Sequence, residues 1–446
     1  MFERNILTEL RKWKESKNRK PLILRGARQV GKTTVIKSFG NEFEQFIYLN
    51  LDLDEDASVF EDKLPFGELI NRIFFISNKK KEYKKTLLFI DEIQNSPSAV
   101  GKLRYFYEET PDLFVIAAGS LLESLIDVHI SFPVGRCEYM VLRPMNFTEY
   151  LKAVGEIQSA EMVENADVPD YAHPKLIDMF RKYTYIGGMP EAISVYIKDQ
   201  DFLLVNKVFE SLLVSYTDDV EKYSSGKAME SVIRHCIRSS FETAGSRIKF
   251  EGFGNGKYKS REIGEALRTL EKAMLLYLVY PATSLEMPVI TNKRMSPRLH
   301  ILDTGLINYF AGVQANFFRQ ENLMDLYKGK IIEHIVGQEF LSSDFSPLHS
   351  IKFWVREKKQ SSAEIDYIII REGKIIPVEV KSGSTGRMKS LHYFMENSEY
   401  DLAVRIYADK FRTEEITAIS GKKFRLINLP LYLSGSIGKI IDKYGG

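Results

Sequence analysis

The chain has 446 residues, of which 44% are hydrophobic and 27% charged, and its formal net charge is +2. These values indicate a globular, soluble protein of several domains, and they give no whole-molecule electrostatic argument for binding nucleic acid or a membrane. The two cysteines, Cys137 and Cys236, are too few for a disulfide framework or a cysteine metal cluster.

No apolar run approaches the length of a membrane span, and charged residues interrupt the first twenty positions. We therefore expect no membrane segment, no secretory signal and a cytoplasmic location. Near the start, Phe2, Ile6, Leu10 and Trp13 recur at helical spacing, which predicts an amphipathic helix.

Residues 26–33 read GARQVGKT, the phosphate-binding pattern of a glycine, four residues and then Gly-Lys-Thr. An apolar run at 21–24 and a helical pattern at 34–39 give the motif its strand–loop–helix context. Lys32 can reach the β- and γ-phosphates, and the Thr33 hydroxyl can ligate Mg²⁺. The expected nucleotide-binding residues are Gly26, Ala27, Arg28, Gln29, Val30, Gly31, Lys32, Thr33 and Thr34. The alternative is an ordinary turn that contains glycine.

A second apolar run, 86–90, ends in Asp91 and Glu92. Open α/β sheets place their sites at the carboxyl ends of buried strands, where such acids would lie. Asp91 would support Mg²⁺, and Glu92 would orient and polarise the attacking water. The alternative is a pair of solvated acids in a loop.

Two further residues are candidates for contact with the γ-phosphate. Ser120 follows a third apolar run, 113–118, and could sense the phosphate or the lytic water. Arg136 follows a turn glycine and precedes another predicted strand, and its guanidinium suits the charge of phosphoryl transfer. A turn serine and a structural salt bridge are the respective alternatives.

The segments GARQVGKT, LLFIDEIQ, AAGS, and GR followed by LRPMNFTEYL together resemble AAA+ ATPases of the archaeal-ATPase-like group. In particular, they resemble bacterial and archaeal ATP-binding proteins with a C-terminal domain of unknown function. The resemblance implies a P-loop NTPase fold with a parallel sheet over 1–155, with ATP and Mg²⁺ as cofactors. It also implies an arginine-finger role for Arg136, and an oligomer if that residue acts on a neighbour's nucleotide.

The middle region, 156–320, is expected to be mostly helical. Ser260 is a candidate N-cap for a helix that carries Arg261, Arg268 and Lys272 opposite its apolar face, and an apolar strand follows at 275–280. This order suggests a winged helix, and relatives in the resembling group are interpreted in the same way. A basic outer face would suit DNA. The alternative is a solvated face of mixed charge.

The last region, 321–446, contains a predicted hairpin of two strands, 363–370 and 375–381. Strand alternation places Glu379 and Lys381 on one face, and Asp366 can face the same side. Glu333, on a predicted helix, could add a third carboxylate for Mg²⁺. Together these residues resemble the core of PD-(D/E)XK nucleases, an α/β restriction-endonuclease-like fold. The alternative is a buried acid–base group kept for folding.

The sequence therefore predicts an ATP-hydrolysing AAA+ protein, a nucleotide-driven machine associated with DNA that carries a nuclease-like C-terminal domain. The alternative function is an ATP-gated switch or scaffold that binds DNA or a protein partner without cutting.

Overall fold

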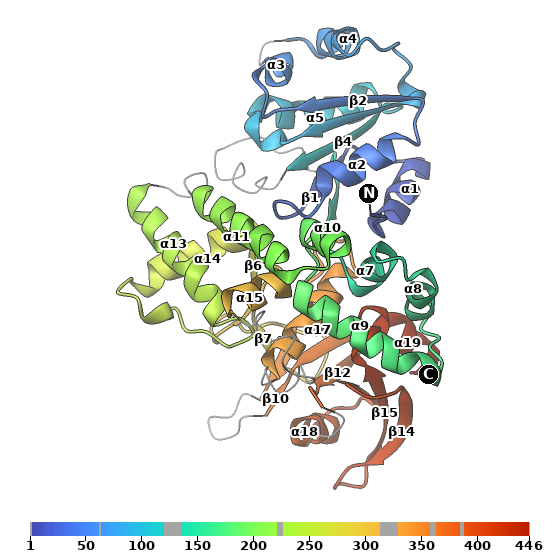
Figure 1. The fold of residues 1–446 in the computed structure, drawn as a ribbon, viewed down its shortest axis with the longest axis vertical. Helices are drawn as coiled ribbons and strands as arrows, with labels where there is room; N and C mark the ends of the chain where they lie inside the picture. The colour runs from blue at the N-terminus through green and yellow to red at the C-terminus, as the bar shows by residue number, and fades with distance from the viewer. Residues whose placement is uncertain are drawn as a thin grey trace. The chain divides into compact units, whose positions relative to one another are not determined.

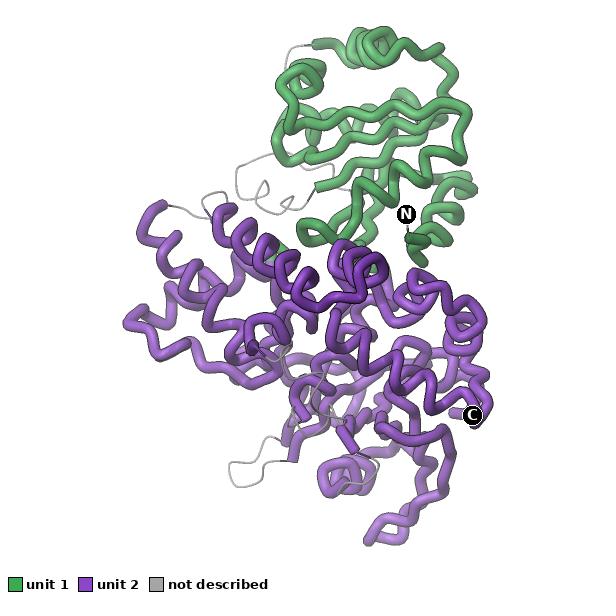
Figure 2. The backbone as a smooth tube through the Cα atoms, viewed as in Figure 1, with its two compact units in different colours: residues 1–143, 272–274, 345–348 green, residues 144–271, 275–344, 349–446 purple. Residues whose placement is uncertain are grey.

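The computed structural model describes residues 2–61, 64–119, 135–220, 226–312, 329–356, 363–383 and 388–445. They form two compact units, which Figure 2 colours separately: 1–143, 272–274 and 345–348 in one, and 144–271, 275–344 and 349–446 in the other. Each unit has its own hydrophobic core. The three-part division expected from the sequence, 1–155, 156–320 and 321–446, stays a prediction.

The first unit is built on a five-stranded parallel sheet in the order β2-β3-β4-β1-β5 (Figure 1). Its strands are β1 (Leu22–Arg25), β2 (Gln45–Asn50), β3 (Thr86–Asp91), β4 (Phe114–Gly119) and β5 (Glu138–Val141). Every residue of β3 and β4 is buried, as expected for apolar runs in a parallel sheet covered on both faces. The strands predicted from the three apolar runs are therefore confirmed as β1, β3 and β4.

Helices cover this sheet and fix its loops. They are α1 (Ile6–Glu15), α2 (Lys32–Gly40), α3 (Asp54–Ala57), α4 (Phe66–Ile76) and α5 (Pro97–Glu109), with the short turns η1 (Ser58–Phe60), η2 (Tyr83–Lys85) and η3 (Ile93–Asn95). The predicted amphipathic helix is α1, which buries Ile6, Leu10 and Trp13. Val35 and Phe39 are buried along α2, so packing holds the helix that begins at Lys32.

The first half of the second unit is mostly helical, as the sequence predicts. Its helices are α7 (Phe147–Ala153), α8 (Ile157–Glu164), α9 (His173–Ile186), α10 (Pro190–Asp199), α11 (Phe202–Asp218), α13 (Lys227–Glu242), α14 (Ser260–Lys272), α15 (Thr304–Phe310) and α17 (Lys330–Ser342), with the turns η4 (Asp170–Ala172) and η5 (Phe253–Asn255). After α14, β6 (Leu276–Val279) and β8 (Arg298–Ile301) pair antiparallel.

A mixed sheet in the order β11-β12-β13-β15-β14 forms the C-terminal part. Its strands are β11 (Tyr367–Arg371), β12 (Lys374–Val380), β13 (Leu402–Tyr407), β14 (Arg412–Thr417) and β15 (Lys423–Pro430). The predicted hairpin is β11–β12, which turns at Glu372 and Gly373, both with positive φ. Since β12, β13 and β15 run parallel, their carboxyl ends lie at one edge of the sheet.

The strand expected over 363–370 is divided at Asp366. On one side β10 (Glu364–Ile365) pairs with β9 (Phe353–Val355), which also pairs with β7 (Pro281–Ala282); on the other side β11 pairs with β12. Asp366 therefore lies where the chain passes from one sheet to the next. The helix α18 (Lys389–Asn397) packs on the core that contains Trp354, and η7 (Leu431–Ser436) and α19 (Ile437–Tyr444) follow β15.

Candidate functional site

The loop between β1 and α2 has the curled backbone that its sequence predicts. Gln29 and Gly31 have positive φ angles of 61° and 96°, and α2 begins directly after Gly31. A Cβ atom on Gly26 would lie 2.3 Å from the Leu142 carbonyl oxygen, so only glycine fits there. Ala27 and Val30 are buried, Arg28 is half-buried, and Gln29 and Thr34 are exposed.

An arginine that the sequence did not single out supports this loop. Arg4 is buried, and its Nη1 donates a hydrogen bond to the Val30 carbonyl oxygen at 2.9 Å. Its Nη2 donates to the carbonyl oxygen of Arg143 at 2.7 Å. Because these partners are far from Arg4 along the chain, no local pattern in the sequence could reveal the role.

Lys32 is the charged group at the centre of the loop. Its side chain is buried, and Nζ donates to the carbonyl oxygens of Gly26 and Ala27, each at 2.9 Å. Burial lowers the pKa of Lys32 to about 8, although the carboxylates of Glu92 and Asp91 oppose this effect. A nearby anion would restore the preference for the charged ammonium. The loop, the ammonium and the N-terminus of α2 thus fit a phosphate group.

Thr33 and Asp91 meet although they are far apart in sequence. The Thr33 hydroxyl donates to Asp91 Oδ2 at 2.7 Å, and the Tyr48 hydroxyl lies 3.4 Å from the same oxygen. Burial first, and then Asp91, raise the pKa of Tyr48 to about 12, so Tyr48 stays a neutral donor. A hydroxyl and a carboxylate side by side are oxygen ligands of the kind that Mg²⁺ takes, so these residues fit that ion.

Glu92 extends from the end of β3 in a left-handed backbone conformation, with φ of 50°. Its Oε2 accepts a hydrogen bond from Gln94 Nε2 at 2.5 Å, and its backbone N–H donates to Asp91 Oδ1 at 3.1 Å. The carboxylate is therefore held in one orientation next to the phosphate loop. In the sequence Gln94 is only the last residue of the segment LLFIDEIQ, and nothing in that pattern indicates this contact.

The γ-phosphate roles of Ser120 and Arg136 stay predictions. Ser120 lies outside the described residues. Arg136 is exposed, and its Nε forms an ion pair with Glu108 Oε1 at 3.2 Å, which is the structural alternative named above. A finger role for Arg136 stays a prediction.

In the second unit, the residues predicted for a nuclease-like site lie together. Lys381 Nζ lies 2.5 Å from Glu379 Oε1, and the Val380 backbone N–H donates to Asp366 Oδ2 at 2.8 Å. Glu333, on α17, lies 3.7 Å from the guanidinium of Arg298, which also pairs with Glu364. Arg298 and Glu364 are members of this cluster that the sequence did not indicate, because their partners come from distant segments.

Burial and mutual repulsion act on these carboxyl groups. Burial first, and then Asp366, raise the pKa of Glu333 to about 8 and that of Glu379 to about 7. Burial also raises the pKa of Asp366, although Arg298 opposes it. Glu379 Oε2 is buried without a hydrogen-bond partner in the part of the chain that the structure describes. A further positive group near these carboxyl groups would therefore favour their ionised form.

The same carboxylates are not arranged as a ready metal site. Among the described residues, no group of three or more His, Cys, Asp or Glu side chains is placed so that it could hold a metal ion. The carboxylates of this cluster are thus the right type of ligand for Mg²⁺, but their positions do not form a metal site.

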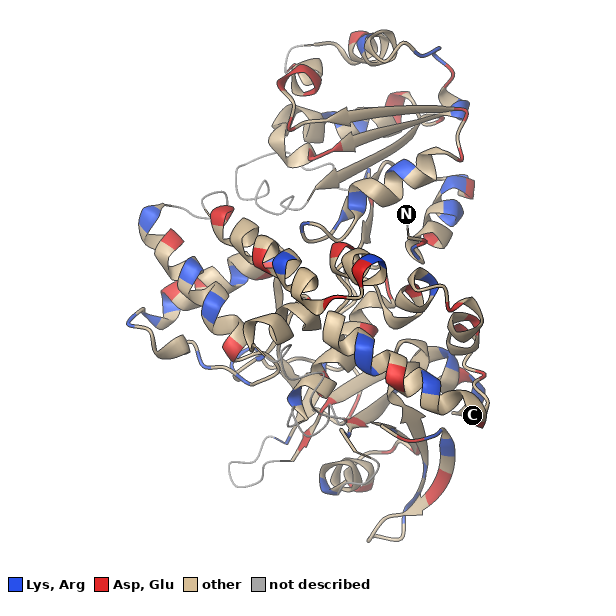
Figure 3. Ribbon diagram, in the orientation of Figure 1, with Lys and Arg blue, Asp and Glu red and all other residues tan. Residues whose placement is uncertain are grey.

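The helices of the middle region carry charged residues, and a small pocket lies among its described residues. Figure 3 shows residues of both signs along α13 and α14. Two acids of α14 accept hydrogen bonds from backbone N–H groups just outside the helix. Glu262 accepts from Lys259, and Glu271 accepts from Leu278. Arg261 and Arg268 remain exposed.

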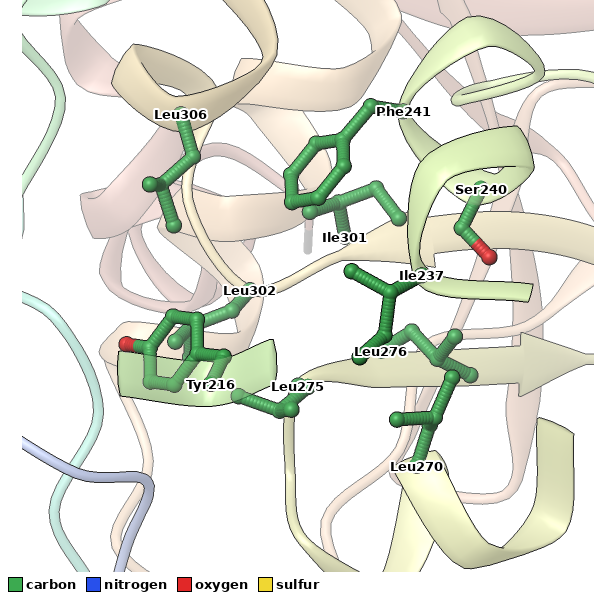
Figure 4. A pocket seen from close by; sticks show the side chains of 10 residues that line it. All are labelled: Tyr216, Ile237, Ser240, Phe241, Leu270, Leu275, Leu276, Ile301, Leu302 and Leu306. Atoms are coloured by element: carbon green, nitrogen blue, oxygen red, sulfur yellow. The ribbon is translucent and has the colours of Figure 1, made fainter. Parts of the chain in front are cut away.

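The pocket in Figure 4 is almost wholly apolar, which indicates core packing rather than a polar binding site. The side chains that line it are Tyr216, Ile237, Ser240, Phe241, Leu270, Leu275, Leu276, Ile301, Leu302 and Leu306.

Comparison with protein families identifies three segments. Residues 18–151 match an AAA domain. Residues 177–316 and 328–432 match two domains of unknown function, DUF8612 and DUF4143. No curated protein matches the chain. The first unit therefore has an AAA-type P-loop ATPase fold, in agreement with its sheet and loop. Separately, none of the helices in the described ranges combines the length and the apolar composition that a membrane span requires.

Solved structures give distant likenesses. The Walker-type ATPase PABY2304 of Pyrococcus abyssi is 16% identical with a TM-score of 0.45, over 70% of this chain and 96% of that one. The Aeropyrum pernix ORC1 protein in complex with DNA is 13% identical with a TM-score of 0.29, over 70% and 93%. The Thermotoga maritima RuvB Holliday junction branch migration motor is 16% identical with a TM-score of 0.28, over 65% and 92%.

Proposed function

We propose that the protein binds ATP with Mg²⁺ and hydrolyses it at the loop between β1 and α2. Lys32 and the backbone N–H groups after Gly26 would hold the phosphates, and Thr33 with Asp91 would hold the ion. A bound Mg²⁺ would supply charge neutralisation at the phosphates. Glu92 would orient the attacking water and accept its proton. Ser120 and Arg136 are proposed contacts to the γ-phosphate.

One observation carries this proposal: the Thr33 hydroxyl donates to Asp91 Oδ2 beside a buried lysine ammonium. A structural turn has no need of these three groups together. The hydrogen bond of Glu92 with Gln94 supports the same proposal, because it holds a carboxylate next to the loop.

Phosphate release by the purified chain tests the proposal. We expect Glu92→Gln to bind a fluorescent ATP analogue as the parent does but to release phosphate at least about a hundredfold more slowly, the range of a lost general base. Lys32→Ala should lose analogue binding. Equal and near-zero release by the parent and Glu92→Gln would refute hydrolysis.

We further propose that the ATPase works in association with DNA and that the C-terminal domain is nuclease-like. The cluster of Glu333, Asp366, Glu379 and Lys381 supports this, as do the exposed Arg261 and Arg268 of a winged-helix-like segment. Cleavage of DNA by the parent with Mg²⁺, and its loss in Glu379→Ala, is the expected result. Absence of cleavage from both proteins would contradict it.

The alternative is an ATP-gated switch or scaffold with an inactive nuclease-like domain. One observation favours it: among the described residues, no group of three or more His, Cys, Asp or Glu side chains is placed to hold a metal ion. ATP hydrolysis measured with duplex and single-stranded DNA separates partners, since stimulation points to DNA and indifference to a protein. We also propose a cytoplasmic location for the ATPase, and an oligomer if Arg136 acts on a neighbour's nucleotide.

A further inference from the structure

A row of polar side chains crosses the C-terminal sheet where its parallel strands end. Glu379 on β12 lies opposite Arg405 on β13, and Arg405 lies opposite Asn428 on β15. All three share the face covered by α18, because their neighbours two residues earlier, such as Ala403 and Leu426, pack in the core with that helix. Carboxyl ends of parallel strands are where α/β sheets bind ligands.

Arg405 is buried and forms no ion pair among the described residues, although Glu379 lies opposite it on β12. Its side chain belongs to a residue only 7% exposed, and its Nε has no hydrogen-bond partner within the described ranges. Its neighbours are the Met388 sulfur, 4.0 Å from Nη1, and the ring of Tyr407, whose centroid is 4.7 Å away. Burying the Nε–H of a guanidinium without an acceptor is unfavourable.

The groups beside Arg405 are also incompletely satisfied. Asn428 is fully buried, and neither its amide nitrogen nor its amide oxygen has a partner in the described structure. Arg412 on β14, opposite Asn428, places a second guanidinium 5.8 Å from the same Tyr407 ring. Its Nε pairs with Glu414 Oε1 at 2.8 Å. Two guanidinium groups thus lie near one ring, and only that of Arg412 is paired with a carboxylate.

We propose that Arg405 and Arg412, with the Asn428 amide, bind a phosphate group at this edge of the sheet. A guanidinium fork matches phosphate oxygens, and an anion would supply the acceptor that the Arg405 Nε–H lacks. The Glu379 carboxylate, next in the row, is paired with Lys381, so its charge is offset. For a polynucleotide phosphate the inference rests on the proposed DNA association; a free phosphate has the same chemistry.

Binding is measured on the full chain carrying Lys32→Ala, which removes the phosphate grip of the first unit, in EDTA so that no metal-dependent cleavage occurs. The probes are a fluorescent DNA strand and, separately, inorganic phosphate. Arg405→Met is compared with the matched change Arg425→Met on β15. Arg425 is exposed, and because it lies three residues before Asn428 on the same strand, it is on the other face of the sheet.

We expect Arg405→Met to weaken binding at least about tenfold and to lower the salt dependence of DNA affinity by about one unit of slope, as a lost phosphate contact does. Arg425→Met should bind as the parent does. The melting temperature of Arg405→Met should not fall, because replacing an unpaired buried charge by an apolar side chain is neutral or stabilising. Arg405→Lys keeps the charge without the fork and should bind with intermediate affinity.

Loss of DNA binding in Arg405→Met supports a polynucleotide phosphate, and loss of inorganic phosphate binding alone supports a small phosphate ligand. Unchanged binding of both probes by Arg405→Met overturns the proposal, as does a parent that binds neither. A fall in melting temperature with unchanged affinity would show a structural arginine and also overturn it. These results are independent of ATP hydrolysis and DNA cleavage, so a failure of either proposed activity is distinguishable.

Discussion

Glu339, on α17, is a fully buried acid whose contacts indicate that it is protonated. The Tyr183 hydroxyl oxygen lies 2.8 Å from both the Met145 carbonyl oxygen and Glu339 Oε1. A hydroxyl has one hydrogen, and the carbonyl can only accept, so the contact with Glu339 is best satisfied by a proton on Glu339. Burial raises the pKa of Glu339 to about 8, which agrees with this assignment.

Glu339 therefore predicts a pH dependence of stability. The pKa of an unfolded glutamate is about 4.3, so folding takes up a proton at pH values between that pKa and about 8. Its contribution is fully present below the unfolded pKa and is lost as pH rises through the window. The melting temperature of the parent should fall as pH is raised from 5 to 8, because over this range the folded state binds more protons than the unfolded state. Glu339→Gln, which does not titrate, should fall less.

Glu415→Gln, at an exposed position of β14, is the control for this experiment and should keep the slope of the parent. Part of the slope should persist in Glu339→Gln, because burial also raises the pKa of Asp303 to about 6. Parallel pH curves for the parent and Glu339→Gln would contradict the assignment of a neutral Glu339.

At the scale of elements, the turn between α9 and α10 is locked onto the start of α15. The Asp303 carboxylate accepts from the backbone N–H groups of Gly188, at 2.6 Å, and Gly305, at 2.9 Å. Gly187, in this turn, has φ of 79°, and a Cβ there would lie 2.2 Å from Asp303 Oδ1. The turn thus needs glycine for its backbone and for its space.

Gly187→Ala and Gly155→Ala compare two glycines of positive φ, one in crowded and one in open surroundings. Gly155 has a similar φ of 85° but open space around its Cβ position. We expect Gly155→Ala to lower the free energy of unfolding by about 1–2 kcal/mol, the cost of the left-handed conformation, and Gly187→Ala to lower it further. Urea unfolding of both variants measures the difference. Equal losses would mean that the turn can move away from Asp303.

The sequence predicts elements well where the pattern is local. The strands β1, β3 and β4, the phosphate loop and the β11–β12 hairpin all follow from short runs of residues, and the structure has each of them. The division of a strand at Asp366 could not be predicted, because it depends on pairing β10 with β9. Contacts such as Arg4 with Val30, or Arg298 with Glu364, join segments that no spacing rule connects.

At the scale of the whole molecule, residues 142–147 run from the first unit into the second, and hydrogen bonds within each unit hold the two ends of this segment. In the first unit, the Leu142 carbonyl oxygen packs against Gly26 of the phosphate loop, and the Leu142 N–H donates to the Arg25 carbonyl oxygen at 2.8 Å. In the second unit, the Met145 N–H donates to the Gly188 carbonyl oxygen at 2.7 Å, and the Phe147 N–H donates to Glu339 at 2.9 Å. Residues 142–147 are therefore hydrogen-bonded at both ends.

We expect this segment to report the nucleotide state. A ligand that tightens the phosphate loop should reduce local opening around Leu142, and the short chain should carry that restraint to the hydrogen bonds of Met145 and Phe147. Hydrogen exchange with and without a non-hydrolysable ATP analogue should therefore show slower exchange over 142–147 as well as in the loop. Lys32→Ala should show neither change, since it lacks the ammonium that holds the phosphates. Protection of the loop with unchanged exchange at Met145 and Phe147 would mean that the effect of the nucleotide ends within the first unit, and the proposed nucleotide-driven machine would then need another route of coupling.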